Sequence, residues 1–178
     1  MQFNLLTIVL GIISMPLAFT YPFMKRITYW PQLFLGLTFN WGIIMCWTSL
    51  TNTISIEPLV LYLSAIFWTL GYDTIYGLQD ILDDEIIGIK STSIKFKNNV
   101  KIFVGTCYSL CVFLILIMFF TMEINKYLLL LIIPFIASFV YQVKIFKVFN
   151  SESCLLAFKN NNLIGLLIFI FIFSFNIL

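Results

Sequence analysis

The sequence predicts an all-α integral membrane helical bundle of about six transmembrane helices. Hydrophobic residues make up 61% of the 178 residues and charged residues only 10%, and the mean hydropathy is +1.04. These values lie far outside the range of soluble globular domains. The chain also lacks the alternation of barrel strands, and open strands cannot satisfy their backbone hydrogen bonds in lipid, so the spanning elements are predicted to be helices.

Six apolar stretches are long enough to cross about 30 Å of hydrocarbon at about 1.5 Å per residue. We expect spanning helices at about Phe3 to Thr20, Gln32 to Leu50, Pro58 to Ile75, Ile102 to Thr121, Tyr127 to Val143 and Leu163 to Leu178. The connections are short except for the one after the third stretch, and no repeat or linker divides the chain. We therefore expect a single transmembrane domain over residues 1–178.

The basic residues predict the orientation of this bundle. Nine of the ten Lys and Arg residues follow the first, third and fifth stretches, whereas Lys126 lies on the opposite side with Glu57 and Glu123. By the positive-inside rule the basic side faces the cytoplasm, and both ends of the chain then face outward. A start that enters a helix directly, without a positively charged leader, is typical of the middle of a longer chain.

The acidic residues gather after the third stretch. Five of the eight lie in the thirteen positions from Asp73 to Glu85. If this run continues the preceding helix, Asp73, Asp80 and Asp84 fall within an arc of about 40°. On a soluble helix such a stripe is an ordinary solvated face. At a membrane boundary, where carboxylates are unfavourable, it indicates a site for a divalent cation such as Mg²⁺, whose preferred ligands are hard oxygens.

Histidine is absent, so chemistry at this boundary depends on Asp, Lys, Arg or Tyr. Tyr72 and Tyr76 lie beside the acids, where their rings stabilise a developing cation or their hydroxyls serve as anchors at headgroup depth. Lys25 and Arg26 lie on the same side of the membrane and either bind phosphate or carboxylate or act as positive-inside anchors. Lys90 follows the acids closely enough to reach a bound anion.

Two segments resemble a known family. The first resembles the second aspartate-rich motif of the UbiA-type membrane prenyltransferases and consists of Tyr72 to Tyr76, Asp80-x-x-Asp83-Asp84 and Ile87 to Thr92. The second is similar to the 4-hydroxybenzoate polyprenyltransferases in particular and consists of Tyr21 to Arg26, Trp30-Pro31-Gln32 and Gly36 to Gly42. Together they cover about the first hundred residues, and the apolar helices that follow fit the C-terminal part of the family.

The resemblance implies a nine-helix bundle in which two aspartate-rich motifs hold Mg²⁺ against a polyprenyl diphosphate. Loss of diphosphate leaves an allylic carbocation, which attacks the ring of 4-hydroxybenzoate in ubiquinone biosynthesis. By resemblance, Asp80 and Asp84 are the metal ligands, and Asp73 supports them from deeper in the cavity. Arg26, with Lys25, matches the basic group for the diphosphate or the aromatic acid.

Because they lie beside the acids in the sequence, Tyr72, Tyr76 and Lys90 are expected to contact substrate. The resemblance places the protein in a bacterial or mitochondrial inner membrane, with the acids on the cytoplasmic or matrix side. Polyprenyl diphosphate, 4-hydroxybenzoate and membrane lipid are the expected partners, and no nucleic acid is expected.

The first motif of the family, Asn-Asp-x-x-Asp-x-x-x-Asp, is not supplied by any segment of this sequence. The chain is therefore expected to correspond to the C-terminal two-thirds of a family member. Because Mg²⁺ on a diphosphate needs ligands from both motifs, we expect little or no transfer by this chain alone, unless a separate N-terminal fragment assembles with it.

Two other interpretations stay open at this level. One is a non-catalytic membrane subunit or cation-conducting protein that uses Asp73, Asp80 and Asp84 as a cation site without diphosphate. The other is a split or decaying reading frame whose product has no stable role.

Overall fold

The computed structural model describes residues 3–122 and 126–174, and within these ranges every regular element is a helix. In chain order the elements are α1 (Leu5–Ile27), α2 (Pro31–Phe39), α3 (Gly42–Thr51), α4 (Ile56–Tyr76), α5 (Ile81–Ile87), α6 (Thr92–Lys95), α7 (Val100–Thr121), the 3₁₀ helix η1 (Lys126–Leu131), α8 (Ile132–Ile145), α9 (Ser151–Lys159) and α10 (Asn161–Ser174). The predicted all-α fold class is confirmed.

Five segments of the described chain are long and apolar enough to cross a membrane. They are α1, α2 with α3, α4, α7, and α9 with α10, and Leu129–Ile145 is a shorter apolar helix. Five of the six expected stretches thus coincide with candidate spans, whereas the one expected at Tyr127 to Val143 falls on the shorter helix. The last one begins earlier than expected, at Ser151 rather than Leu163, and residues 175–178 of that expected stretch lie outside the described residues.

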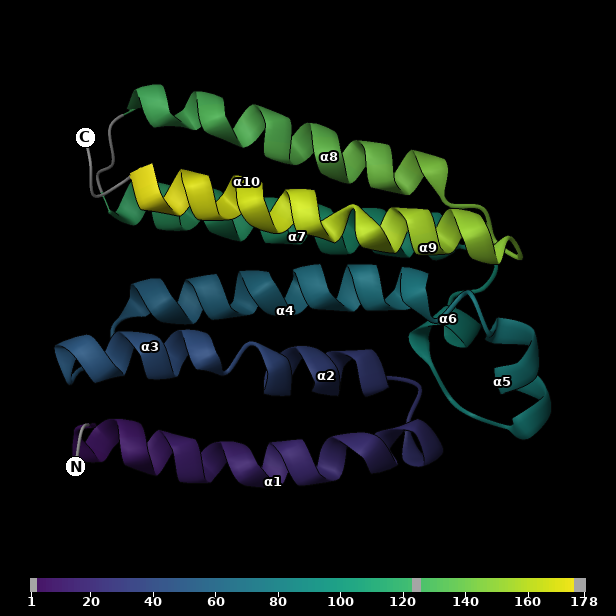
Figure 1. Ribbon diagram of the computed structural model, residues 1–178, viewed down its shortest axis with the longest axis horizontal. Coiled ribbons are helices and arrows are strands. Elements are labelled where there is room, and N and C mark those ends of the chain that lie inside the picture. The colour runs from purple at the N-terminus through teal and green to yellow at the C-terminus, as the bar shows by residue number, and fades with distance from the viewer. Residues whose placement is uncertain (1–2, 123–125, 175–178) are drawn as a thin grey trace.

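Long helices that follow one another in the sequence run antiparallel, whereas α7 runs parallel to α9 and α10 (Figure 1). The layers are formed by α1, by α2 with α3, by α4, by α7 with α9 and α10, and by α8. The connections after α1, α4 and α8 all lie at one end of the bundle, at the right of Figure 1. These connections carry the basic residues and the acidic run that were predicted to share one side of the membrane. Glu57, in the first turn of α4, lies at the opposite end. Glu123 lies outside the described residues.

The first helix is longer than the sequence suggested. α1 continues through Pro16 and Pro22, and its last turn contains Lys25 and Arg26, which were expected in the connection after it. Each proline removes one backbone hydrogen bond. The helix continues nevertheless, because breaking it within lipid would leave further backbone groups without hydrogen-bond partners. The basic side chains thus lie at the C-terminus of a helix, where its dipole favours positive charge.

The second span is interrupted between α2 and α3 at Asn40. The Asn40 side-chain amide donates to the Gly36 carbonyl at 2.9 Å and to Thr69 Oγ1 of α4 at 2.8 Å. The Trp41 indole nitrogen donates to the Leu10 carbonyl of α1 at 3.0 Å. Polar contacts of this kind satisfy groups at a helix break inside an apolar bundle.

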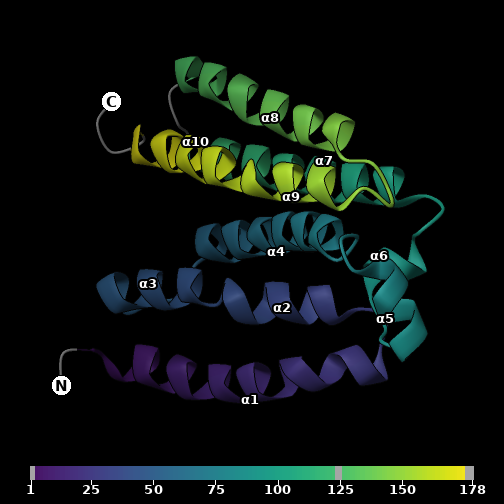
Figure 2. The same cartoon turned by 45° about the vertical axis from the view of Figure 1, so that its right-hand side comes forward.

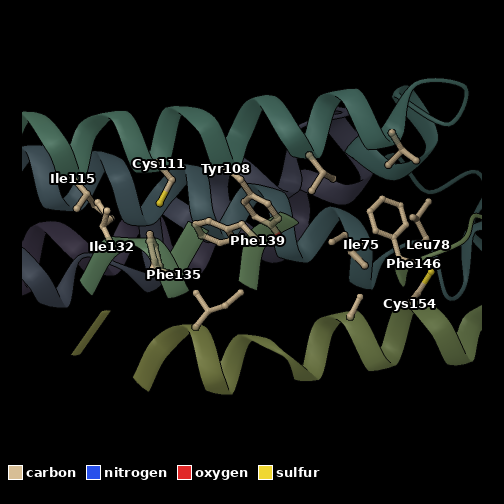
Figure 3. Packing of buried hydrophobic residues seen from close by; sticks show 14 of the residues in the cluster. Ile75, Leu78, Tyr108, Cys111, Ile115, Ile132, Phe135, Phe139, Phe146 and Cys154 are labelled. Atoms are coloured by element: carbon tan, nitrogen blue, oxygen red, sulfur yellow. The ribbon is translucent and has the colours of Figure 1, made fainter. Parts of the chain in front are cut away.

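The core has two parts that share α4. A small cluster joins α4 to α1, α2 and α3, and a larger one joins it to α7, α8, α9 and α10. Figure 3 shows Tyr108 of α7 beside Phe139 of α8, and their rings stack with centroids 4.2 Å apart. A Cβ at Gly71 of α4 would overlap the Tyr108 ring, so the close approach of α4 to α7 requires glycine at this position.

Candidate active site at the acidic end of the bundle

The acidic run does not continue α4 as one helix. α4 ends at Tyr76 with Gly77 as its C-cap, and α5 begins at Ile81 with Asp80 as its N-cap. The expected stripe of Asp73, Asp80 and Asp84 on a single helix is therefore wrong. Asp73 stays in the last turn of α4, whereas Asp80 and Asp84 belong to the short α5. Figures 1 and 2 both place α5 beside the end of α1.

Asp80 and Asp84 keep their spacing of four residues on α5, where the Asp84 amide donates to the Asp80 carbonyl at 2.9 Å. The Asp80 side chain makes no capping hydrogen bond. Asp84 is half-buried. Burial raises the pKa of the Asp84 carboxyl, the ammonium of Lys25 opposes this shift, and the carboxylates of Asp80 and Asp83 add to it. A bound cation would relieve this repulsion.

Lys25 is the basic residue that the structure brings to the acids. Its ammonium acts electrostatically on both Asp73 of α4 and Asp84 of α5. The Asp73 carboxylate also acts electrostatically on Tyr21, one turn earlier on α1. Arg26 is exposed at the same helix end, and in the part of the chain that the structure describes the only ion pair joins Lys97 and Glu85, at 2.7 Å.

The segment after α5 returns to α1. Gly88 ends α5 with a φ of 79°, a left-handed conformation that glycine adopts without strain. Two residues later the Lys90 amide donates to the Lys25 carbonyl at 2.9 Å. The Lys90 ammonium donates to the Ile27 carbonyl at 3.2 Å, so in this conformation it caps α1 rather than reaching toward the acids.

Polar contacts anchor the next residues beneath the end of α4. The Thr92 and Thr74 hydroxyls lie 2.6 Å apart, and the Ser93 hydroxyl donates to the Thr74 carbonyl at 2.7 Å. The Thr92 amide donates to Oε1 of the buried Gln32 at 3.0 Å. A Cβ at Gly77 would meet Ser93 Oγ at 2.6 Å. The two segments that carry the family resemblance therefore contact each other directly.

A cluster of aromatic rings joins the last turns of α4 to α9. It consists of Trp68, Tyr72 and Tyr76 on α4 and Phe158 on α9. Phe158 lies against both tyrosines, with centroid distances of 5.8 Å to Tyr72 and 4.8 Å to Tyr76. Tyr72 also packs edge-on against Trp68 at 6.1 Å. Both tyrosine rings thus pack against α9 through Phe158, and these contacts do not decide between the two expected roles.

Among the described residues, no group of three or more His, Cys, Asp or Glu side chains is arranged to hold a metal ion. Mg²⁺, however, is usually held by one or two carboxylates, with waters and substrate phosphates completing the shell. Asp80 and Asp84 fit that donor set, and the mutual repulsion of the acids favours a cation at this place. A cation held by α5 would depend on a phosphate ligand for part of its coordination.

These features define a class of protein, namely a membrane-spanning helical bundle with carboxylates, a lysine and aromatic rings gathered at one end. The chain belongs to the UbiA prenyltransferase family, whose family model matches residues 1–175.

Curated relatives come from bacteria and from animal mitochondria. The chain is 40% identical to a 4-hydroxybenzoate octaprenyltransferase from Histophilus somni and 36% identical to one from Sodalis glossinidius, in each case over 94% of the chain and 58% of the relative. It is 49% identical to the mitochondrial 4-hydroxybenzoate polyprenyltransferase of Drosophila melanogaster, over 58% of the chain and 27% of the relative. The chain thus spans about 58% of the length of the bacterial relatives.

Among solved structures, the apo structure of a UbiA homolog from Aeropyrum pernix K1 matches with a TM-score of 0.73 at 20% identity. The match covers 94% of this chain and 65% of that one. At this identity the likeness concerns the fold, and it confirms the arrangement of spanning helices expected from the sequence.

Sequence reasoning missed the residues that hold the site together. Gln32 and Thr74 lie within the two resembling segments and Ser93 directly follows one of them, but no role was expected for these three residues. Their hydrogen bonds fix the segment that follows the acids. Phe158 was one of 20 phenylalanines and gave no signal of its own. Besides the resemblance, the polarity of Gln32 at the start of an apolar stretch was an available clue, since a buried amide needs a partner.

Proposed function

We propose that the chain takes part in transfer of a polyprenyl group from a polyprenyl diphosphate to the ring of 4-hydroxybenzoate, as in ubiquinone biosynthesis. The observation that carries this proposal is the contact between the two resembling segments, made by Lys90 with Lys25 and by Thr92 with Gln32. It supports one site built from α1, α4 and α5. The names of the curated relatives support the choice of acceptor.

In this proposal Asp80 and Asp84 hold Mg²⁺, which supplies neutralisation of the diphosphate charge. Asp73, half-buried in the last turn of α4, supports this pair from the membrane side. Because Asp80 leaves its own helix uncapped, its carboxylate is available for this role.

Lys25 and Arg26 attract the anionic groups of the two substrates. The electrostatic effect of Lys25 on both Asp73 and Asp84 supports this role, since a diphosphate held by α5 would meet the same positive charge. Arg26 offers a fork suited to a phosphate or a carboxylate. Lys90 contributes mainly by holding the segment after α5 against the end of α1 through its hydrogen bonds to Lys25 and Ile27.

Tyr72 and Tyr76 line the apolar side of the site. Their ring faces stabilise positive charge on the allylic carbon as the bond to diphosphate breaks, and their packing against Phe158 fixes their orientation. The carbon of the acceptor ring beside its hydroxyl then forms the new bond to the prenyl group, and that carbon loses its proton.

We place this reaction in a bacterial inner membrane or a mitochondrial inner membrane, with the acids on the cytoplasmic or matrix side. The basic end of the bundle supports that orientation. A long prenyl chain enters from the surrounding lipid, while the aromatic acid enters from water.

Use of the acids for cation conduction is less well supported. That function needs carboxylates along a path through the membrane. Among the described residues, Asp80, Asp83, Asp84 and Glu85 lie beyond the end of α4, and Glu57 lies in its first turn at the opposite end.

The test uses membranes that contain these 178 residues with 4-hydroxybenzoate and a polyprenyl diphosphate. One sample contains the chain alone. A second also contains the part of the Histophilus somni relative that this chain does not cover. Since the described residues form no three-carboxylate metal group, we expect prenylated 4-hydroxybenzoate in the second sample and little in the first. Robust product from the chain alone contradicts the need for added ligands, and no product in either sample contradicts the proposed function.

A further inference from the structure

A groove between α7 and α8 lies apart from the acidic site. Its cavity volume is about 490 Å³, which falls within the range of roughly 300–1,000 Å³ that is typical of small-molecule sites. Its walls are almost wholly apolar and include Gly105, Val112, Leu116, Ile136, Val140 and Lys144. A Cβ at Gly105 would meet no atom within 4 Å, so the glycine opens the groove rather than serving helix packing.

The charge in this groove is confined to one end. Lys144, in the last turn of α8, is the only charged residue in its lining. Lys101 lies one turn before Gly105 on α7, and its ammonium lies 5.4 Å from the ring of Phe146, just after α8. Both lysines therefore lie at the end of the bundle that carries the basic connections. An anionic group at this end meets positive charge, and an apolar chain extends from it along the groove.

The length of the groove matches one leaflet of a bilayer. From Gly105 to Leu116 the α7 wall extends about 16 Å at roughly 1.5 Å per residue, about half of the roughly 30 Å hydrocarbon core. An acyl chain whose headgroup lies at the lysine end thus fills the groove without crossing the midplane.

The chemistry of the lining favours a phospholipid over a prenyl diphosphate. A diphosphate held by Mg²⁺ needs carboxylate ligands, and no Asp or Glu lines this groove. A phosphodiester carries a single negative charge, for which the ammonium of Lys144 is a sufficient counter-charge. Basic pockets between transmembrane helices on the cytoplasmic or matrix side are typical sites for anionic lipid headgroups.

We propose that the α7–α8 groove binds an anionic phospholipid, with its phosphodiester against Lys144 and one acyl chain along α7. This site is independent of the proposed prenyl transfer. It gives the chain a lipid-binding site separate from the acidic site.

The test uses the full chain in vesicles made of equal parts of phosphatidylcholine and phosphatidylglycerol, with a trace of phosphatidylglycerol that carries a photoactivatable group in its acyl chain. After illumination, adducts are mapped by mass spectrometry. We expect them at Val112, Phe113 and Val140, and we expect unlabelled phosphatidylglycerol to displace them better than phosphatidylcholine does. Lys144→Gln should lower labelling about fivefold. Gly105→Leu, which fills the groove, should abolish it.

Matched controls separate binding from folding. Lys159→Gln removes a lysine of α9 that does not line the groove, and Thr106→Leu places the same leucine side chain at an exposed position on α7 outside it. Both should label like the unaltered chain, and all variants should unfold at similar temperatures. Equal displacement by the two lipids, adducts confined to other helices, or stronger displacement by a polyprenyl diphosphate would each overturn the proposal.

Discussion

The backbone amide of Lys90 donates to the carbonyl of Lys25 at 2.9 Å. This bond joins residues 65 positions apart in the sequence and brings the last turn of α1 against the segment that follows the acids. As a result the Lys25 ammonium acts on carboxylates from two other helices, Asp73 of α4 and Asp84 of α5. The acidic motif thus has its own counter-charge rather than being a bare acidic stripe.

The turn between α4 and α5 depends on the absence of a side chain at Gly77. We expect Gly77→Ala to destabilise the fold by about 1–3 kcal/mol, because the new Cβ would meet Ser93 Oγ at 2.6 Å and overpacking typically has an effect of this size. Thermal unfolding in detergent measures the loss. Adding Ser93→Gly should recover part of it, since the clashing side chain is then gone. Gly105→Ala, at an open position, should have little effect, and an equal loss there would contradict the steric explanation.

Titration of Asp84 tests the electrostatic arrangement. The pKa of this carboxyl is raised by burial and by Asp80 and Asp83, against the pull of Lys25. We expect Lys25→Gln to raise that pKa further and Asp83→Asn to lower it. Carbon-13 NMR of labelled aspartate, with Asp84→Asn to assign the signal, measures both shifts.

The same raised pKa has a consequence for stability. A carboxyl with a higher pKa in the folded state than in the unfolded state binds its proton more tightly when folded. Its contribution to stability is therefore present below the unfolded pKa and is lost as the pH rises through the folded value. Lys25→Gln should enlarge this loss, and a decrease with pH no steeper than that of the unaltered chain would argue against the placement of Lys25.

Much of the fold was predictable because one physical constraint dominates it. Apolar stretches in lipid must be helices of a certain length, and this fixed the spans and the shared end of the basic connections. The shape of the acidic run was not predictable from helical periodicity. Asp80 is a favoured N-cap residue, and Asp83 with Asp84 places acids in a first helical turn, so these residues favour the start of α5 over the continuation of α4.

The contacts that complete the site were beyond the reach of sequence patterns. Thr92 and Gln32 are 60 residues apart, and Tyr76 and Phe158 are 82 apart. Which polar residue meets which depends on how α4 packs between α2 and α9, and that packing is determined by shape rather than by periodicity. The family resemblance identified the two segments that meet, but it did not show that they bond to each other through Lys25 and Lys90.

The role of Tyr76 can be separated into ring and hydroxyl. If its ring face stabilises positive charge beside Phe158, Tyr76→Phe should keep prenyl transfer nearly unchanged, whereas Tyr76→Leu should lower the rate about two- to tenfold. The measurement is product formation in membranes that also contain the uncovered part of the Histophilus somni relative. If Tyr76→Phe is as slow as Tyr76→Leu, the hydroxyl is the group that matters.

The most direct test of the central claim compares Asp84→Asn and Asp80→Asn with Glu85→Gln in those same membranes. Glu85 is exposed and paired with Lys97, so it controls for loss of one negative charge from α5. If Asp80 and Asp84 hold Mg²⁺ against the diphosphate, either asparagine should lower formation of prenylated 4-hydroxybenzoate at least about 100-fold, and Glu85→Gln should lower it less than about twofold. Near-normal product from both asparagine variants would contradict the account.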